Sequence, residues 1–308
     1  MKIGKKQIAA LLLVLTVVIT SCDTWLFDDR DGCELGVYVH LYSKTPCQTD
    51  TVYPKEVKQF TIYTFDERAK LASIKRVKTD GLSSNNRTLV PLLTPGMYSV
   101  IAWAGVTDDV FTESSLRLGE TKKEELLLKL KESKSATLNP DVRVYNGMGE
   151  AFLVGTTGLN SYFVDTQVNL REISNRIKIS VEGIKNPEDY AIEIDSKNGA
   201  YAINGDIVFG ESIHYQSFDR VIEEDAVSEH FTTLKLLTGY NSVLTIKKNE
   251  EVLYQEDLLG TLLLKNPLIN LACDNDFVVK FKARESCQCV EIWVNNWLIH
   301  SYETELGI

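Results

Sequence analysis

Polar and apolar residues alternate along most of the chain, and this period of two predicts β-strands rather than helices. In the stretch 36–42 (GVYVHLY), Val37, Val39 and Leu41 fall on one face and the residues between them on the other. Branched apolar residues repeat in the same way in 175–183 (NRIKISVEG). We therefore expect strands that bury one face in a core and show the other to solvent.

Turn-forming residues separate these alternating stretches and predict hairpins. The stretch 57–77 divides at the turn 66–68 (DER), and 190–209 contains Asn-Gly turn signals at 198–199 and 204–205. Further strands or hairpins are expected at 93–105, 242–258, 274–286 and 289–303.

Only two stretches fit a helix. Residues 115–133 fit either an amphipathic helix with a Glu125–Lys129 pair or a strand through 126–130. Residues 257–266 predict a short helix capped by Asp257.

The last predicted strand, 289–303, carries two tryptophans four residues apart. On one extended strand, this even spacing places Trp293 and Trp297 on one face and Val294 and Leu298 on the other. A strand that is apolar on both faces needs cover on both. It therefore pairs within its own domain or is offered to another chain.

Many short strands with regular turns predict an all-β fold with few short helices, and the length fits two β-sandwich domains in tandem. After a signal peptide at 1–21, we expect an N-terminal sandwich at 22–164 and a C-terminal sandwich at 165–308.

The N-terminal segment predicts export. Residues 1–6 carry three lysines, and the apolar run 8–19 is shorter than the roughly 20 residues that span a bilayer. The sequence 20–22 (TSC) resembles a lipobox, so Cys22 is the expected lipid attachment site. The alternative is an ordinary signal peptide that ends near a cysteine. The acids that follow, at 28–31 (DDRD), resemble a surface-export signal of Bacteroidetes lipoproteins, or else form a solvated linker.

Charge argues against a nucleic-acid partner. The formal net charge is −10, and removing residues 1–21 with their three lysines makes it −13. Nucleic-acid affinity depends on cationic contacts with phosphates, so we expect no nucleic-acid binding.

Five cysteines follow Cys22, and an odd number in an exported chain leaves at least one thiol free or paired between chains. They are Cys33, Cys47, Cys273, Cys287 and Cys289, and their pairing stays open. The Cys-x-Cys spacing at 287–289 lacks the second cysteine or histidine pair of a zinc site, so no metal is expected.

No nucleophile with a base and no pair of carboxylates stands out, so the sequence predicts neither an enzyme nor a cofactor. Gly147, Gly149 and Gly155 lack the strand–turn–helix context of a phosphate loop. The stretch 139–147 lacks the alternating oxygen ligands of a calcium loop, so both stretches are interpreted as turns.

Several stretches together resemble the FimB-like fimbrium anchoring subunits of Bacteroidales, lipoproteins that hold type V fimbriae at the outer membrane. The similar stretches are 20–22, 28–42, 57–71, 97–105, 144–155, 170–183 and 290–302. The chain departs from the family at 294–297, where VNNW stands in place of a string similar to Ile-Asn-Gly-Trp.

The resemblance implies transthyretin-like sandwiches and assembly by strand exchange between subunits. In shaft subunits of that family, a protease cuts after an arginine and releases the first strand, whereas anchors keep their N-terminus and lipid. A cut after Arg30 would leave the strand at 37–42 in place, which favours an anchor over a shaft subunit.

The leading hypothesis is a non-enzymatic, lipid-anchored fimbrial anchoring or minor subunit. It would sit at the outer-membrane surface, at the base of the fimbrium, with fimbrial shaft subunits as partners. The predicted subunit-docking residues are Trp293, Val294, Trp297, Leu298 and Tyr302. The alternative is a surface glycan-binding lipoprotein, which needs a flat, exposed platform of aromatic side chains.

Overall fold

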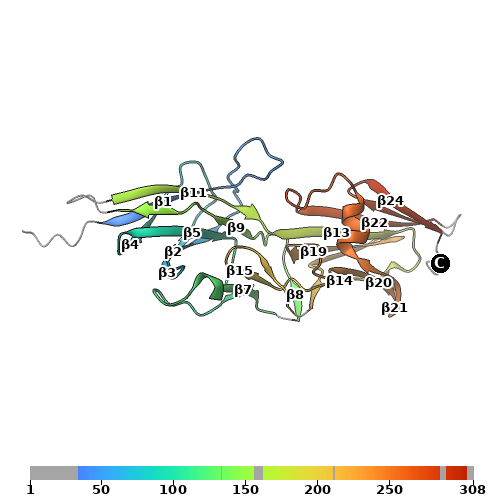
Figure 1. Ribbon diagram of the computed structural model, residues 1–308. Helices are drawn as coiled ribbons and strands as arrows, with labels where there is room; N and C mark the ends of the chain where they lie inside the picture. The colour runs from blue at the N-terminus through green and yellow to red at the C-terminus, as the bar shows by residue number, and fades with distance from the viewer. Residues whose placement is uncertain (1–33, 133, 156–161, 211, 285–288, 304–308) are drawn as a thin grey trace, which may run out of the picture.

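The computed structural model describes residues 34–132, 134–155, 162–210, 212–284 and 289–303, with the backbone alone at 284, 289 and 301–303. The molecule is elongated, and its two halves lie end to end with most strands along the long axis (Figure 1). The predicted signal peptide and Cys22 lie outside the described residues. Within the described part, no helix is both long and apolar enough to cross a membrane.

The first half is a β-sandwich of two sheets. Sheet I has the strand order β11-β1-β4, and sheet II has the order β12-β9-β5-β2-β3, with β10 also paired to β5. The strands are β1 (Leu35–Tyr42), β2 (Gln59–Asp66), β3 (Leu71–Lys78), β4 (Thr88–Leu92), β5 (Gly96–Ala104), β9 (Tyr145–Met148), β10 (Phe152–Val154), β11 (Tyr162–Asn169) and β12 (Arg171–Glu172).

The predicted alternation of the first strand is confirmed. Val37, Val39 and Leu41 are buried and share a core between sheets I and II with even-numbered residues of β5 such as Val100. Trp103, on the opposite face of β5, is also buried, in a separate apolar cluster. Sheet II is therefore covered on both faces.

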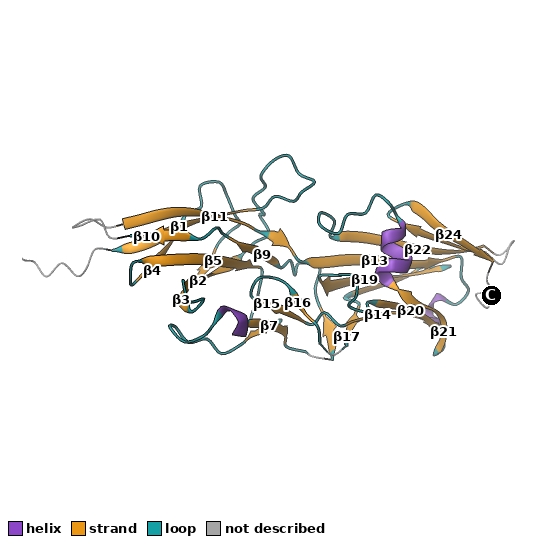
Figure 2. Ribbon diagram, in the orientation of Figure 1, coloured by secondary structure: helices purple, strands orange, loops and turns teal. Residues whose placement is uncertain are grey.

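A third, smaller sheet provides the second cover (Figure 2). Sheet III has the order β16-β15-β7-β6. Its elements are β6 (Phe111–Glu113), the 3-10 helix η1 (Lys123–Glu125), β7 (Leu127–Leu130), β15 (Ala200–Ala202) and β16 (Ile207–Val208). Because β7 pairs with β15, this sheet joins two segments far apart in the sequence.

The second half is another sandwich. Sheet IV has the order β18-β19-β13-β22-β23-β24, and sheet V has the order β21-β20-β14-β17-β8. The strands are β8 (Ser135–Thr137), β13 (Ser174–Glu182), β14 (Tyr190–Ser196), β17 (Ile213–Gln216), β18 (Asp219–Ile222), β19 (Ala226–Leu234), β20 (Val243–Lys248), β21 (Glu251–Asp257), β22 (Asp276–Arg284), β23 (Cys289–Val294) and β24 (Trp297–Glu303). The short helices are η2 (Pro187–Asp189), the π-helix η3 (Leu258–Leu262) and η4 (Leu263–Lys265).

The two helix expectations have different outcomes. In 115–133 the strand alternative is correct, since β7 occupies 127–130 and only η1 is helical. At 257–266 the predicted short helix is confirmed, and the Asp257 carboxylate accepts a hydrogen bond from the Gly260 N–H as its cap.

The prediction of one terminal strand at 289–303 is wrong, because this stretch is the hairpin β23–β24. Asn295 and Asn296 form its turn, both with left-handed backbone at φ 47° and 63°. This conformation is the one that two-residue hairpin loops require, and asparagine tolerates it better than most residues.

The all-β fold of tandem sandwiches with few short helices is confirmed. The predicted division between residues 164 and 165 falls inside β11, which pairs with β1 along its whole length. One apolar cluster runs from sheet II through sheet III into sheets IV and V. The two sandwiches therefore share a core, and their division into domains stays a prediction.

Candidate functional site

The hairpin that carries the predicted docking residues ends sheet IV with an open edge. Within the described residues, β24 pairs with β23 alone. Trp297 and Leu298 begin β24 and keep 44% and 43% of their surface exposed. An unpaired strand edge with exposed apolar side chains can accept a strand from another chain.

Charge distinguishes this edge from two of the other long edge strands, β3 and β21, whereas β11, at the edge of sheet I, carries a single acid as β24 does. The sequence of β24 is WLIHSYE, with a single acid at its end. The edge strand β3 carries three basic residues, and β21 carries three acids. Because charged side chains discourage strand addition, β24 is better suited to pairing than β3 or β21.

The inner face of the hairpin belongs to the core. Val290, Ile292 and Val294 are buried, and Val294 has none of its surface exposed. The Asn266 side-chain amide, just after η4, donates a hydrogen bond of 2.9 Å to the Val294 carbonyl. Val294 therefore cannot contact a partner in this fold, and its predicted docking role is withdrawn.

The outer face places Trp293 beside Leu298, which lies directly opposite it across the hairpin. The Trp293 indole N–H donates to Glu291 at 3.2 Å, and the Lys282 ammonium lies 5.8 Å from its ring centroid. Trp297 instead lies opposite Val294. The prediction that the two tryptophans share a face is thus wrong, because the turn reverses the chain between them.

A further exposed leucine lies near the turn of the hairpin. The Leu268 N–H donates to the Asn266 side-chain oxygen at 2.9 Å, and Leu268 is 73% exposed. Since Asn266 also holds Val294, the residue opposite Trp297, these contacts bring Leu268 close to the β24 edge. Sequence patterns did not single out Leu268. The side chain of the remaining predicted residue, Tyr302, lies outside the described residues.

An ion-pair network with a buried centre lies where the two sandwiches meet. The Arg176 guanidinium contacts Glu172 and Asp276, each at 2.5 Å, and Arg143 contacts Glu172 at 3.4 Å. The side chains of Arg176 and Glu172 are only 12% and 10% exposed. The hydrogen bond from Arg176 holds the pKa of Asp276 below its usual range.

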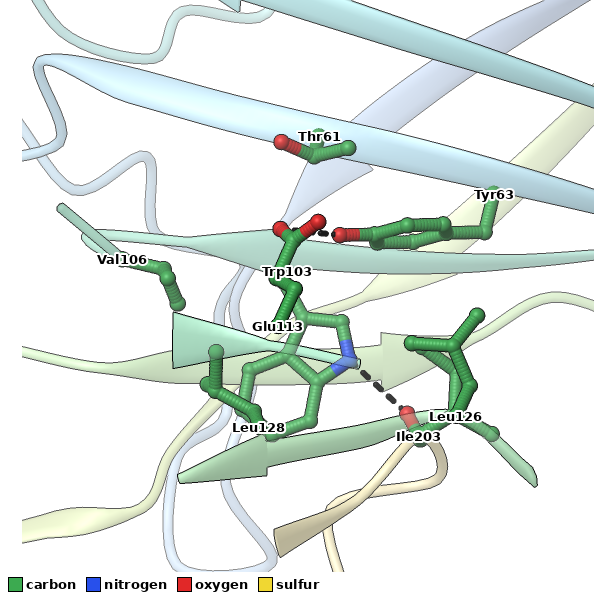
Figure 3. Close-up of a pocket in the computed structure, with 8 residues that line it drawn as sticks. All are labelled: Thr61, Tyr63, Trp103, Val106, Glu113, Leu126, Leu128 and Ile203. Carbon is green, nitrogen blue, oxygen red and sulfur yellow. Dashed lines mark hydrogen bonds between the residues drawn. The ribbon is translucent and has the colours of Figure 1, made fainter. Parts of the chain in front are cut away.

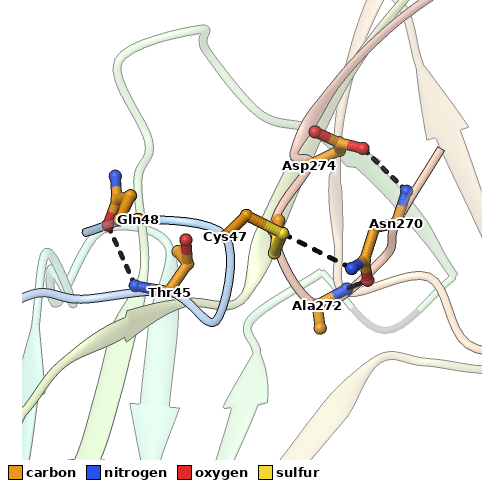
Figure 4. Close-up of a disulfide and its surroundings, with 7 residues drawn as sticks. Thr45, Cys47, Gln48, Asn270, Ala272 and Asp274 are labelled. Atoms are coloured by element: carbon orange, nitrogen blue, oxygen red, sulfur yellow. Dashed lines mark hydrogen bonds between the residues drawn. A yellow bond between two sulfur atoms is a disulfide. The ribbon is translucent and has the colours of Figure 1, made fainter. Parts of the chain in front are cut away.

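A disulfide between Cys47 and Cys273 provides a second link between the halves (Figure 4). Cys47 lies in the loop after β1, and Cys273 lies shortly before β22. The two residues are 226 positions apart in the chain. The sequence left this pairing open, and the other cysteine side chains lie outside the described residues.

A cavity between sheets II and III is too small to be a binding site. It holds about 10 Å³, roughly the space of one water molecule. Figure 3 shows the Tyr63 hydroxyl donating to Glu113 at 2.6 Å and the Trp103 indole N–H donating to the Ile203 carbonyl at 2.8 Å. Burial, together with the Glu113 carboxylate, raises the pKa of Tyr63. These groups fasten sheet III to sheet II.

One cluster of potential metal ligands occurs in the described part. Glu193, Asp195 and His214 have side-chain atoms within 4.8 Å of one another on sheet V. The Lys247 ammonium lies 2.7 Å from Glu193, and His214 lies 3.3 Å from Asp195. These contacts make the cluster a set of ion pairs on a half-exposed sheet face.

Comparison with known proteins identifies the family. The family described as "Fimbrillin-A associated anchor proteins Mfa1 and Mfa2" matches residues 30–303. The Minor fimbrium anchoring subunit Mfa2 of Porphyromonas gingivalis is 34% identical over 301 residues, which cover 94% of this chain and 92% of that protein. The chain belongs to this family of fimbrial anchor proteins, as the resemblance in its sequence predicted.

Solved structures with a similar fold include a member of this family. The fimbrial anchor protein Mfa2 from Porphyromonas gingivalis superimposes with a TM-score of 0.79 at 33% identity, covering 88% of this chain and all of that one. A protein from Bacteroides thetaiotaomicron described as a putative polysaccharide binding protein has a TM-score of 0.70 at 19% identity, covering 88% and 98% of the two chains. The second likeness shows the fold alone. The family consists of structural fimbrial subunits, which associate with other subunits at the fimbrium.

Proposed function

We propose that this chain is a lipid-anchored fimbrial anchor that holds the base of a fimbrium at the outer membrane. Cys22 is acylated after removal of residues 1–21 and keeps the protein in the membrane. The β24 edge of the second sandwich binds the fimbrial polymer. The proposed role of the chain itself is non-enzymatic and uses no cofactor and no nucleic acid.

The positions of the two ends support the anchor. The described chain starts at Glu34 at one end of the first sandwich, and it ends at Glu303 at the far end of the second (Figure 1). The 12 residues between Cys22 and Leu35 extend over at most about 40 Å. The first sandwich would then face the membrane, and the second would face the fimbrium.

The open edge of β24 is the observation that carries the docking proposal. A strand from a shaft subunit would pair with its main chain, and exposed Trp297, Leu298 and Leu268 would provide apolar contacts. We keep Trp293 and Tyr302 in this proposed face because they lie in the same hairpin, and we omit Val294 because it is buried.

Point substitutions test docking better than truncation does. Removing the hairpin would delete Val290, Ile292 and Val294 from the core and unfold the second sandwich. Leu298→Lys adds a charge to the exposed edge without touching the core. Val252→Lys is the matched control, since Val252 is 49% exposed on the edge strand β21.

The measurement is binding of each variant to shaft subunits purified from the same cells. We expect Leu298→Lys to weaken binding at least about tenfold, because a charge on an edge strand opposes pairing. Val252→Lys should bind like the wild type. Equal binding by the two variants would refute docking at β24.

The alternative, glycan binding, has less support. The exposed Phe209 ring lies 6.0 Å from the Tyr240 ring, but their planes are tilted by 48°. Two rings at this angle do not offer the flat platform on which a sugar stacks. Retention of the protein on any polysaccharide of a test panel, lost in Phe209→Ala, would favour this alternative.

A further inference from the structure

We propose that the chain has a second function, which is to carry tensile load through the Cys47–Cys273 disulfide. This inference rests on the proposed function, because a fimbrium under flow pulls on an anchor that the membrane holds. Tension then enters near Leu35, at one end of the molecule, and leaves through β24 in the second sandwich (Figure 1).

The disulfide shortens the covalent route between these two ends. Tension that enters β1 reaches Cys47 a few residues after this strand ends, crosses to Cys273, and continues into β22 shortly afterwards. The 226-residue separation of the cysteines becomes a closed loop beside the route. Roughly 800 Å of extended chain is thereby protected from being pulled out.

The two strands on this route are suited to resist tension. β1 lies between β11 and β4 in sheet I, and β22 lies between β13 and β23 in sheet IV. Each strand is pulled along its own length and is hydrogen bonded on both sides. Extracting it requires many ladder bonds to break together, whereas a strand peeled from an edge loses them one at a time.

The loop that carries Cys47 is fastened at its base. Ser43 and Val52 exchange two backbone hydrogen bonds of 2.8 Å. The Asn169 side chain at the end of β11 accepts from the Lys44 N–H at 2.8 Å and donates to the Lys44 carbonyl at 2.9 Å. The loop that transmits tension from β1 to Cys47 is therefore closed by hydrogen bonds at its base.

The turn that carries Cys273 is fastened by Asn270. Its side-chain oxygen accepts from the Ala272 N–H at 3.0 Å, and its amide contacts the Cys47 sulfur at 3.4 Å (Figure 4). The Asp274 carboxylate in turn accepts from the Asn270 N–H at 2.8 Å. Both ends of the disulfide thus stand on rigid turns next to the strands that they connect.

Single-molecule stretching tests this function. The full mature chain is held at its N-terminus and C-terminus, and the oxidised protein is compared with the same protein after mild reduction and with a Cys47→Ser, Cys273→Ser variant. Since Cys47 is exposed, reduction does not require unfolding. Circular dichroism verifies that the reduced protein and the variant are folded before stretching.

The edge hairpin β23–β24 should peel away first in both redox states, and the oxidised protein should then keep the rest of its fold for longer at each force. When it does extend, it should release roughly 800 Å less than the reduced protein or the variant. As a control, handles at exposed Lys55 and Glu150 should give equal extension in both redox states, because the direct chain between them is shorter than the path through the disulfide. Equal lifetimes under end-to-end tension with and without the disulfide would overturn the proposal.

An experiment in cells distinguishes load bearing from anchoring. Cells with the Cys47→Ser, Cys273→Ser variant should carry as many fimbriae as the wild type at rest and lose them in shear flow. Retention equal to the wild type in flow would contradict load bearing. Failure of anchoring itself is measured with Cys22→Ala, which should shed fimbriae without flow.

Discussion

The indole N–H of Trp103 in β5 donates a hydrogen bond of 2.8 Å to the carbonyl of Ile203, 100 residues later in the chain. The Asn146 side-chain amide donates to the same carbonyl at 3.0 Å. Trp103 also packs its ring 5.6 Å from that of Tyr201 in β15. Sheet III covers sheet II of the first sandwich, and its strands β15 and β16 come from the part of the chain that forms the second sandwich. The two sandwiches therefore depend on each other.

Trp103→Ala should therefore destabilise the whole molecule. The expected loss is about 3–5 kcal/mol in the free energy of unfolding, because a large buried side chain leaves a cavity. Urea unfolding followed by two probes, one in each sandwich, should shift in both. Phe209→Ala is the control, since Phe209 is 58% exposed and should cost little. A shift confined to the first sandwich would contradict the shared core.

Arg176→Met should be costly because it leaves the Glu172 carboxylate short of a partner in a largely buried site. Breaking a buried ion pair from one side costs about 3–5 kcal/mol. Arg117→Met breaks the exposed pair with Glu120, whose side chains are 75% and 70% exposed, and should cost less than about 1 kcal/mol. Equal losses in urea unfolding would mean that the remaining donors to Glu172, from Arg143, Ser174 and Asn275, satisfy its carboxylate.

Asp276 predicts an acid-dependent part of the stability. Its pKa is lower in the folded state because Arg176 donates to the carboxylate, so the folded state releases this proton at lower pH than the unfolded state does. The resulting stabilisation is complete above about pH 4 and is lost as pH falls through the lower, folded-state pKa. The stability gap between the wild type and Asp276→Asn should shrink from pH 5 to pH 3. A constant gap would show that this carboxylate does not titrate differently on folding.

Asn296 predicts a conformational preference at the docking hairpin. Its φ of 63° is left-handed, which costs most residues about 1–2 kcal/mol but costs glycine nothing. Asn296→Gly should keep or slightly raise the melting temperature, and Asn296→Val should lower it. A valine variant as stable as the glycine variant would show that the left-handed backbone at residue 296 does not limit the stability of the turn.

Local patterns predicted most of the strands. Alternation placed β1 and β13 correctly, and the polar turn between β20 and β21 marked a hairpin whose loop residues, Asn249 and Glu250, have left-handed backbone. The terminal hairpin was missed because Asn-Asn is a weaker turn signal than Asn-Gly, and the apolar residues on both sides suggested one continuous strand.

Long-range pairing could not be predicted in the same way. Nothing in 127–130 indicates that its partner is 200–202, because strand pairing depends on the completed fold rather than on local sequence. The Cys47–Cys273 pairing was equally hidden among five cysteines. The open edge of β24 became visible only when the strand order of sheet IV was known.

The most direct test of the anchor is mass spectrometry of the N-terminus of the protein purified from its own cell envelope. The account predicts a chain that begins at Cys22 and carries acyl groups there, with the rest of the mature sequence intact. A free N-terminus beyond Arg30 without lipid would contradict it. The chain would then be released from the membrane and would act as a shaft or tip subunit.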